Sequence, residues 1–312
     1  MEHQGPRSVG AAPAGGLRIC DAHQHLWSYP DSLYLAEQLQ QDVGALPVVA
    51  TIAVEAWPRN LRDGGGLRQP WEETARAVAE GRGNPGRTRI AAGIVGYADL
   101  GQGAAVEAVL EAHLRAGQGR LRGIRPSGDS DLADRHFLEG CAAVAQRGLS
   151  LDLSARGERM RGAAEVAARH PHTPVILNHL GLTPAFPPPQ GEQALARCHR
   201  WEPWARLIDE VAQQPNLYMK LGGLGMDLVS AGWTAPRAPD ARELAELMRP
   251  WYRYCIARFG ARRCMLESNF PVDRRAFAYG DYWDAAQLVT EDLSDLERYW
   301  LFYGTAALAY RI

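Results

Sequence analysis

Eight short apolar segments of strand length recur along this chain, and longer segments with helical periodicity follow them. This alternation predicts parallel strands joined by crossover helices. Eight such units in 312 residues predict an α/β fold, a (β/α)8 TIM barrel formed as one domain by residues 17–312. A doubly wound open sheet is the alternative, although no G-x-G-x-x-G follows the first segment. The predicted strands are residues 17–23, 48–55, 89–96, 121–125, 149–154, 174–179, 216–221 and 262–268.

Composition restricts the partners that such a chain would bind. The formal net charge of −2 favours neither nucleic acid nor an anionic membrane, so a small-molecule substrate is expected. No apolar run approaches the roughly 18 residues that a membrane-spanning helix needs. Five scattered cysteines without metal or redox spacing predict reduced thiols in a cytoplasmic protein. Residues 1–16, rich in Gly, Ala and Pro, are predicted to be a disordered tail, and a homodimer is an open expectation.

Three histidines are predicted to lie at one end of the barrel. His23 ends the first predicted strand and His25 lies two residues further on, so in an extended chain both side chains point to the same side. His179 ends the sixth predicted strand. Because the carboxyl ends of parallel strands form the mouth of a barrel, these imidazoles can converge there on one divalent ion. An H-x-H motif alone is weak evidence for a metal site, and its position at a strand end strengthens that evidence.

Charged residues in the predicted strands have two interpretations each. Arg125 suits the bidentate binding of a substrate carboxylate, or it pairs inside the barrel with Glu55 or Glu267. Glu55 is itself an inward-pointing candidate for substrate binding. Lys220 is either a substrate contact or a partner within the barrel, where Glu267 is one candidate for the ion pair.

Two irregular segments follow the sixth and seventh predicted strands, at residues 181–203 and 222–239. The first contains a proline cluster that forbids regular structure, and both are candidate walls of the pocket or variable surface insertions. Trp27, Trp57 and Trp233 belong to the same end of the barrel and could line the pocket, with Trp27 as a candidate substrate contact.

Several motifs together resemble those of the amidohydrolase-related branch of the amidohydrolase superfamily. Simpler members of this branch include sugar-acid lactonases, a pyrone-dicarboxylate lactonase and nonoxidative decarboxylases. The resemblance extends over residues 18–312 and implies a (β/α)8 barrel in which His23, His25 and His179 match the histidines of the family. It rests on "DAHQHLW", "RGIR", "ILNHLG", "NLYMKLGGLGM", "FGARRCMLESNFPVD" and "LFYGTAALAYRI".

The eighth strand departs from the family pattern. Many members resemble "GSDWP" at this place, with an aspartate that binds metal or acts as general base, whereas this chain has "ESNFP" with Asn269. An amide accepts no proton at neutral pH and is a poor metal ligand. Three groups could replace the aspartate: Glu267, which shares side-chain parity with Asn269; Asp273, which is otherwise a helix cap; or His179 acting as the base without metal.

The resemblance implies a hydrolase that opens the C–O ester bond of a small lactone, of a sugar acid or a carboxylated ring. One divalent ion, zinc or manganese, would activate water, and a metal-free mechanism is the alternative. A second metal is not expected because Arg125, not a lysine, ends the fourth strand. The other functional hypotheses are a nonoxidative decarboxylase of an aromatic or unsaturated acid, and a barrel that binds a ligand without turnover.

Overall fold

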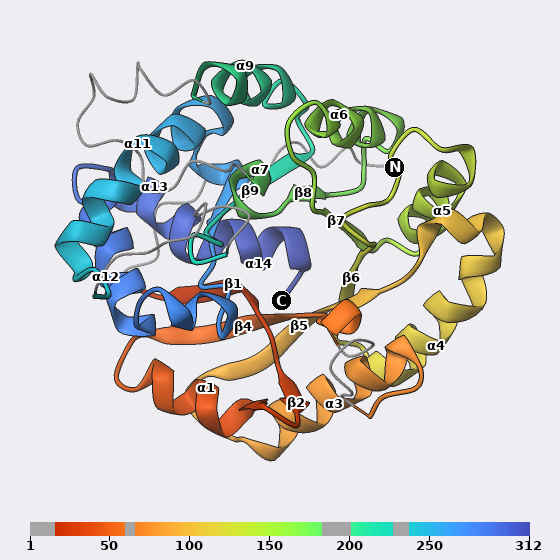
Figure 1. Cartoon of the computed structure of the whole chain (residues 1–312), viewed down its shortest axis with the longest axis horizontal. Helices are drawn as coiled ribbons and strands as arrows, with labels where there is room; N and C mark the ends of the chain where they lie inside the picture. Colours follow the sequence, from red (N-terminus) through yellow and green to blue (C-terminus); the bar gives the residue numbers. More distant parts are fainter. Residues whose placement is uncertain (1–15, 60–65, 183–200, 227–236) are drawn as a thin grey trace, which may run out of the picture.

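The structure is a computed structural model that describes residues 16–59, 66–182, 201–226 and 237–312. Eight parallel strands form a nearly closed barrel surrounded by helices, which confirms the predicted single-domain TIM barrel (Figure 1). Each strand pairs with the next one along the chain, as expected where helical crossovers connect parallel neighbours. The strands are β1 (Ile19–Gln24), β4 (Val48–Val54), β5 (Arg89–Tyr97), β6 (Leu121–Arg125), β7 (Ser150–Leu153), β8 (Val175–Leu177), β9 (Leu217–Leu221) and β10 (Cys264–Leu266).

The seam between the first and last strands brings two parts of the site together. Backbone N–H of Asn269 donates to the carbonyl of His23 at 2.9 Å, and that of His25 donates to the carbonyl of Phe270 at 2.8 Å. A parallel bridge joins Gln24 to Phe270 between these bonds. The segment after β10 is therefore fixed beside the end of β1.

Helices cover the outside of the barrel with their apolar faces. In the helix at 201–211, for example, one face buries Trp204, Leu207, Ile208 and Val211. None of the helices in the described ranges is both long and apolar enough to cross a membrane. The longer helices are α1 (Ala36–Val43), α3 (Pro70–Gly83), α4 (Glu107–Gly117), α5 (Arg135–Gln146), α6 (Arg159–Arg169), α9 (Trp201–Val211), α11 (Ala241–Phe259) and α12 (Tyr279–Val289); the shorter ones are α7 (His179–Leu182), η1 (Leu100–Val106), η2 (Ala261–Arg263), η3 (Val272–Arg275), α13 (Asp295–Tyr299), η4 (Trp300–Gly304) and α14 (Thr305–Tyr310).

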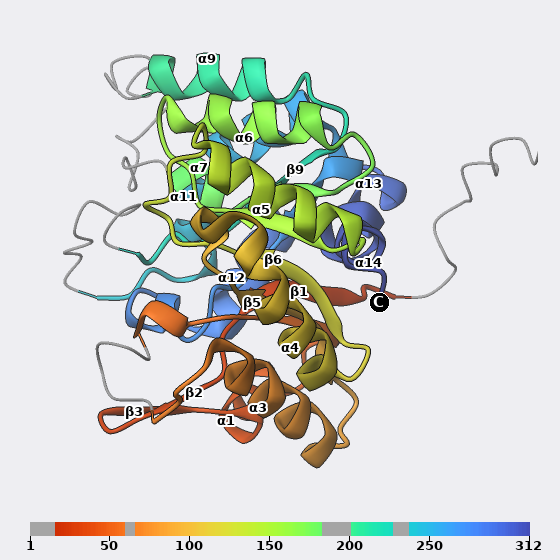
Figure 2. The same ribbon diagram turned by 90° about the vertical axis from the view of Figure 1, so that its right-hand side faces the viewer.

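An antiparallel hairpin was not predicted from the strand pattern. Strands β2 (Trp27–Tyr29) and β3 (Ser32–Tyr34) form it directly after β1. The hairpin and the C-terminus lie toward opposite ends of the barrel (Figure 2). Consequently α14 approaches the barrel interior from the end opposite the hairpin.

Some sequence predictions fall outside the described residues. They include the tail, except for Gly16, together with Trp233 and most of both irregular segments. Four of the five cysteines are described, and all four are free and buried: Cys20, Cys141, Cys255 and Cys264.

Candidate active site

Glu267 and His179 form a close polar pair at the mouth of the barrel. Oε1 of Glu267 accepts hydrogen bonds from Nδ1 of His179 at 2.6 Å and from its backbone N–H at 3.2 Å. In the neutral form of this ring, Nδ1 donates to the carboxylate and Nε2 keeps a lone pair. Gly222 and Gly223 make room for the pair, since a Cβ atom at these positions would lie 2.3 Å from Glu267 and 2.5 Å from the His179 ring. The "KLGG" sequence thus permits this contact.

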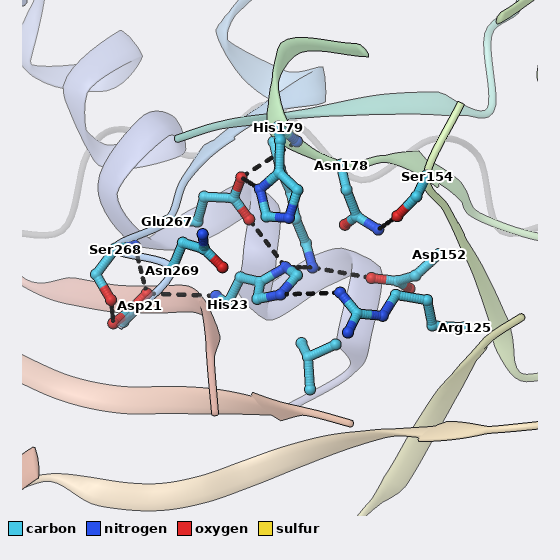
Figure 3. Close-up of polar contacts among 12 residues, drawn as sticks. Asp21, His23, Arg125, Asp152, Ser154, Asn178, His179, Glu267, Ser268 and Asn269 are labelled. Carbon is cyan, nitrogen blue, oxygen red and sulfur yellow. Dashed lines mark hydrogen bonds and ion pairs between the residues drawn. The ribbon is translucent and has the colours of Figure 1, made fainter. Parts of the chain in front are cut away.

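His23 lies between several charged groups (Figure 3). Its Nδ1 is 3.0 Å from Oε2 of Glu267 and 3.2 Å from Nζ of Lys220. On the other edge of the ring, Nε2 is 3.2 Å from Nη1 of Arg125. Burial, followed by the positive charge of Lys220, holds the pKa of His23 well below its usual value. The imidazole is therefore neutral at physiological pH.

His25 is neutral as well, and its orientation is fixed by the backbone. Its Nδ1 donates to the carbonyl of Val54 at 2.8 Å, which leaves a lone pair on Nε2. Burial and the nearby charge of Arg125 lower its pKa to about 3. The ring of Trp27 stacks on His25 with ring centroids 5.6 Å apart, so this tryptophan packs directly behind the site.

Arg125 and Lys220 each have a buried carboxylate partner. Nε of Arg125 donates to Oε1 of Glu55 at 2.6 Å, so the Arg125–Glu55 pair left open by the sequence is present. Lys220 pairs with Asp152 at 2.9 Å, a partner that sequence analysis did not name. The ion pair of Glu267 with Arg125 or Lys220 that the sequence suggested does not form. Glu267 contacts His23 and His179 instead.

Asn269 and Asp273 form a second polar pair after β10. Nδ2 of Asn269 donates to Oδ1 of Asp273 at 2.8 Å, which turns the amide oxygen of Asn269 away from that carboxyl. Burial raises the pKa of Asp273 to about 8. Asp273 lies in the short helix η3, whose N-cap is Pro271, so it does not occupy the N-cap position considered from the sequence.

Several buried polar groups that hydrogen-bond around the site were not predicted from the sequence. Asp21 accepts hydrogen bonds from the hydroxyls of Ser268 at 2.6 Å and Tyr279 at 3.0 Å. Asp152 accepts one from Tyr310 at 2.5 Å. Asp152 is a charged residue inside the apolar strand "LDL", and this could have indicated a buried polar site. Its partners could not be identified because they lie far away in the sequence.

Three of the groups could hold a metal ion. One nitrogen from each of His23 and His179 and one oxygen of Glu267 lie within 4.8 Å of one another. Oε2 of Glu267 is buried and accepts no well-aligned hydrogen bond in the described part of the chain, although Nδ1 of His23 lies 3.0 Å away. Two imidazoles and a carboxylate form a donor set typical of zinc, so the residues fit a divalent ion. His25 lies next to this cluster, with its ring centroid 4.9 Å from that of His23.

A barrel with imidazoles and a carboxylate clustered at the ends of its strands places these groups where TIM-barrel enzymes have their active sites. The sequence profile of the family described as Amidohydrolase matches residues 20–312. The chain therefore belongs to the amidohydrolase family and is an enzyme of that family.

Relatives and solved structures match over nearly the whole chain. L-fucono-1,5-lactonase of Burkholderia ambifaria is 27% identical over 311 residues, covering 94% of this chain and 95% of the relative. The uncharacterized protein y4mH of Sinorhizobium fredii is 29% identical over 326 residues, covering 95% of this chain and 99% of the relative. A zinc-bound crystal structure of an amidohydrolase from Burkholderia multivorans is 25% identical, covers 95% of this chain and 100% of that chain, and has a TM-score of 0.73.

Proposed function

We propose that this enzyme hydrolyses the C–O ester bond of a small lactone, most closely a six-membered lactone of a sugar acid. The observation that carries the proposal is the 2.6 Å hydrogen bond between Glu267 and His179, which leaves a basic nitrogen at the mouth of the barrel. The full-length similarity to a lactonase supports the substrate class.

His179 would act as the general base, and Glu267 would hold its ring. As water attacks the lactone carbonyl, Nε2 of His179 takes a proton from the water. When the ring C–O bond breaks, the imidazolium returns that proton to the leaving alkoxide oxygen, so a hydroxy acid forms. The Glu267 carboxylate stabilises the transient imidazolium by its contact with Nδ1.

In a second form of the mechanism, His179 is a metal ligand in place of the base. His23, His179 and Glu267 would then hold one divalent ion, zinc or manganese, with His25 beside them. When bound, such an ion supplies an acidified water and polarises the substrate carbonyl. The zinc-bound relative supports zinc as the first ion to test. A metal-free reaction that uses only the His179 base is the alternative.

Polar groups around the histidines would bind the lactone. Arg125, whose side chain is 14% exposed, would hold a carbonyl or carboxylate oxygen while Glu55 fixes its guanidinium. The amide oxygens of Asn178 and Asn269 are buried and have no hydrogen-bond partner among the described residues. Each can accept a hydrogen bond from a substrate hydroxyl or from water, as a polyhydroxylated lactone would offer. Trp27 would contribute to the substrate site indirectly, because its ring packs on His25 and holds that imidazole in place.

The test is a panel of purified lactones that includes L-fucono-1,5-lactone, related sugar lactones and a carboxylated pyrone. We expect acid release without gas, measured with a pH indicator, and a hydroxy acid as product. The same protein would be tested before and after chelation, with elemental analysis of both samples.

Other outcomes lead to other functions. Release of carbon dioxide from aromatic or unsaturated acids, with no lactone opened, would replace the lactonase with a decarboxylase. No turnover of either panel by protein of native stability would favour the ligand-binding barrel.

A further inference from the structure

Lys220 is the only lysine in the chain. Of the 34 Lys and Arg residues in the sequence, the other 33 are arginines. The side chain of this single lysine is 0% exposed and lies on β9, inside the barrel. A buried ammonium is costly unless it is paired and hydrogen-bonded, so its position needs a specific explanation.

Two partners fix the ammonium in place. Nζ of Lys220 is 2.9 Å from Oδ2 of Asp152, and the same oxygen accepts the hydroxyl of Tyr310. Oδ1 of Asp152 accepts the hydroxyl of Ser150 at 3.1 Å. The ammonium also lies 5.3 Å from the centroid of the Tyr310 ring, a cation–π contact. Helix α14, part of the closing motif, therefore supports a charge in the barrel interior.

The ammonium lies between Asp152 and His23. It is 3.2 Å from Nδ1 of His23, while Nη1 of Arg125 is 3.2 Å from Nε2 of the same ring. A neutral imidazole has only one acceptor nitrogen, so the two contacts cannot both be hydrogen bonds to a lone pair. A cation bound at either nitrogen of His23 would thus be added next to a positive charge that is already present.

We propose that Lys220, held by Asp152 and Tyr310, is a resident cation that weakens divalent-metal binding by His23, His179 and Glu267. Lys220 is then a positioning residue that acts through His23, not a contact of the substrate. The inference concerns the candidate metal cluster alone, and its test reads zinc binding, so it stands or fails independently of the lactone reaction.

Four proteins test the charge effect: the wild type, Lys220→Arg, Lys220→Met and the double variant Lys220→Met/Asp152→Asn. Their zinc affinities would be measured by competition with a chromophoric chelator, and thermal unfolding would establish that each is folded. The double variant is the main test, because it removes the ammonium without leaving a buried unpaired carboxylate, and Lys220→Arg is the matched control because it keeps the positive charge.

We expect the double variant to bind zinc at least about tenfold more tightly than the wild type, because a close positive charge has been removed. Lys220→Met should bind more tightly still, since it retains the negative charge of Asp152, and Lys220→Arg should resemble the wild type. Equal affinity in the wild type and the folded double variant would overturn the proposal.

A second measurement needs no variant. Protein labelled with ¹⁵N only at the lysine Nζ has a single side-chain resonance, which is assigned without further work because there is one lysine. Zinc that binds at the cluster should shift this resonance with the same saturation curve as the metal content. A resonance that stays unchanged while one equivalent of zinc binds would overturn the proposal, even if the Lys220 variants do not fold.

Discussion

Two carboxyl groups follow β10, and their surroundings differ in one decisive way. Glu267 and Asp273 are both buried. Glu267 bonds to the imidazole of His179 at 2.6 Å, whereas Asp273 bonds to the amide of Asn269 at 2.8 Å. An imidazole can take and return a proton near neutral pH, and an amide cannot.

The difference indicates which pair would replace the aspartate that is common in the family as the group that transfers the proton. Glu267 and His179 together can hold and release a proton. Asp273, with its pKa raised to about 8 by burial, holds its own proton at neutral pH and orients Asn269. We therefore expect substitutions in the first pair to affect turnover far more than substitutions in the second.

The largest effect is expected for His179→Asn. Loss of the base should lower kcat by about 10³-fold, because general-base catalysis typically contributes 10²–10⁴-fold. The measurement is the steady-state rate on the best lactone of the panel, at equal protein stability. Wild-type kcat in this variant would exclude His179 as the base.

The exposed pair His136–Glu139 on α5 provides a matched control. Its side chains lie 3.3 Å apart, and that of His136 is 62% exposed. His136→Asn makes the same chemical change outside the site and should leave kcat unchanged. A similar loss in this control would show that the effect of His179→Asn is not local.

Glu267→Gln should have the next largest effect. The amide keeps the shape of the side chain but loses the charge that stabilises the imidazolium, so kcat should fall by about 10²-fold with a smaller change in KM. Elemental analysis of the variant measures any loss of metal separately. Glu139→Gln is the matched control, and a Glu267→Gln enzyme as active as this control would remove the distinction between the two carboxyl groups.

The sequence predicted the barrel well and the site in part, for physical reasons. Apolar strands and amphipathic helices are local patterns, so all eight strands were located from periodicity. The H-x-H motif is also local, and the structure brings His23, His25 and His179 together. The pairing of Lys220 with Asp152 depends on residues 68 positions apart and on packing inside the barrel, which periodicity does not encode.

Asn269→Ala tests the second pair and should have a moderate effect. The change removes the amide oxygen that faces the site and leaves Oδ1 of Asp273 without its donor. We expect kcat/KM to fall about tenfold, well below the loss in Glu267→Gln. A loss of about 10³-fold, with stability unchanged, would instead place Asn269 at the centre of the chemistry.

Asp273→Asn should have the smallest effect on turnover, about threefold or less, because an amide can still accept the hydrogen bond from Asn269. Its clearest effect should be on the pH dependence of stability. The pKa of Asp273 rises from 3.8 to about 8 on folding, so between these values the folded chain holds a proton that the unfolded chain releases. The unfolded state binds fewer protons, and the free energy of unfolding therefore falls as pH rises through this window.

Asparagine cannot lose that proton, so Asp273→Asn should gain stability relative to the wild type as pH rises from 4 to 9, by about 5 kcal/mol, since one pKa unit corresponds to about 1.4 kcal/mol. Denaturant unfolding of both proteins across this range measures the difference. Other buried acids such as Asp21 and Glu73 are present in both proteins, so their contributions cancel in the comparison. If the stability difference stays constant with pH, Asp273 is ionised in the folded protein, and it then remains a candidate for the proton transfer that we assign to His179 and Glu267.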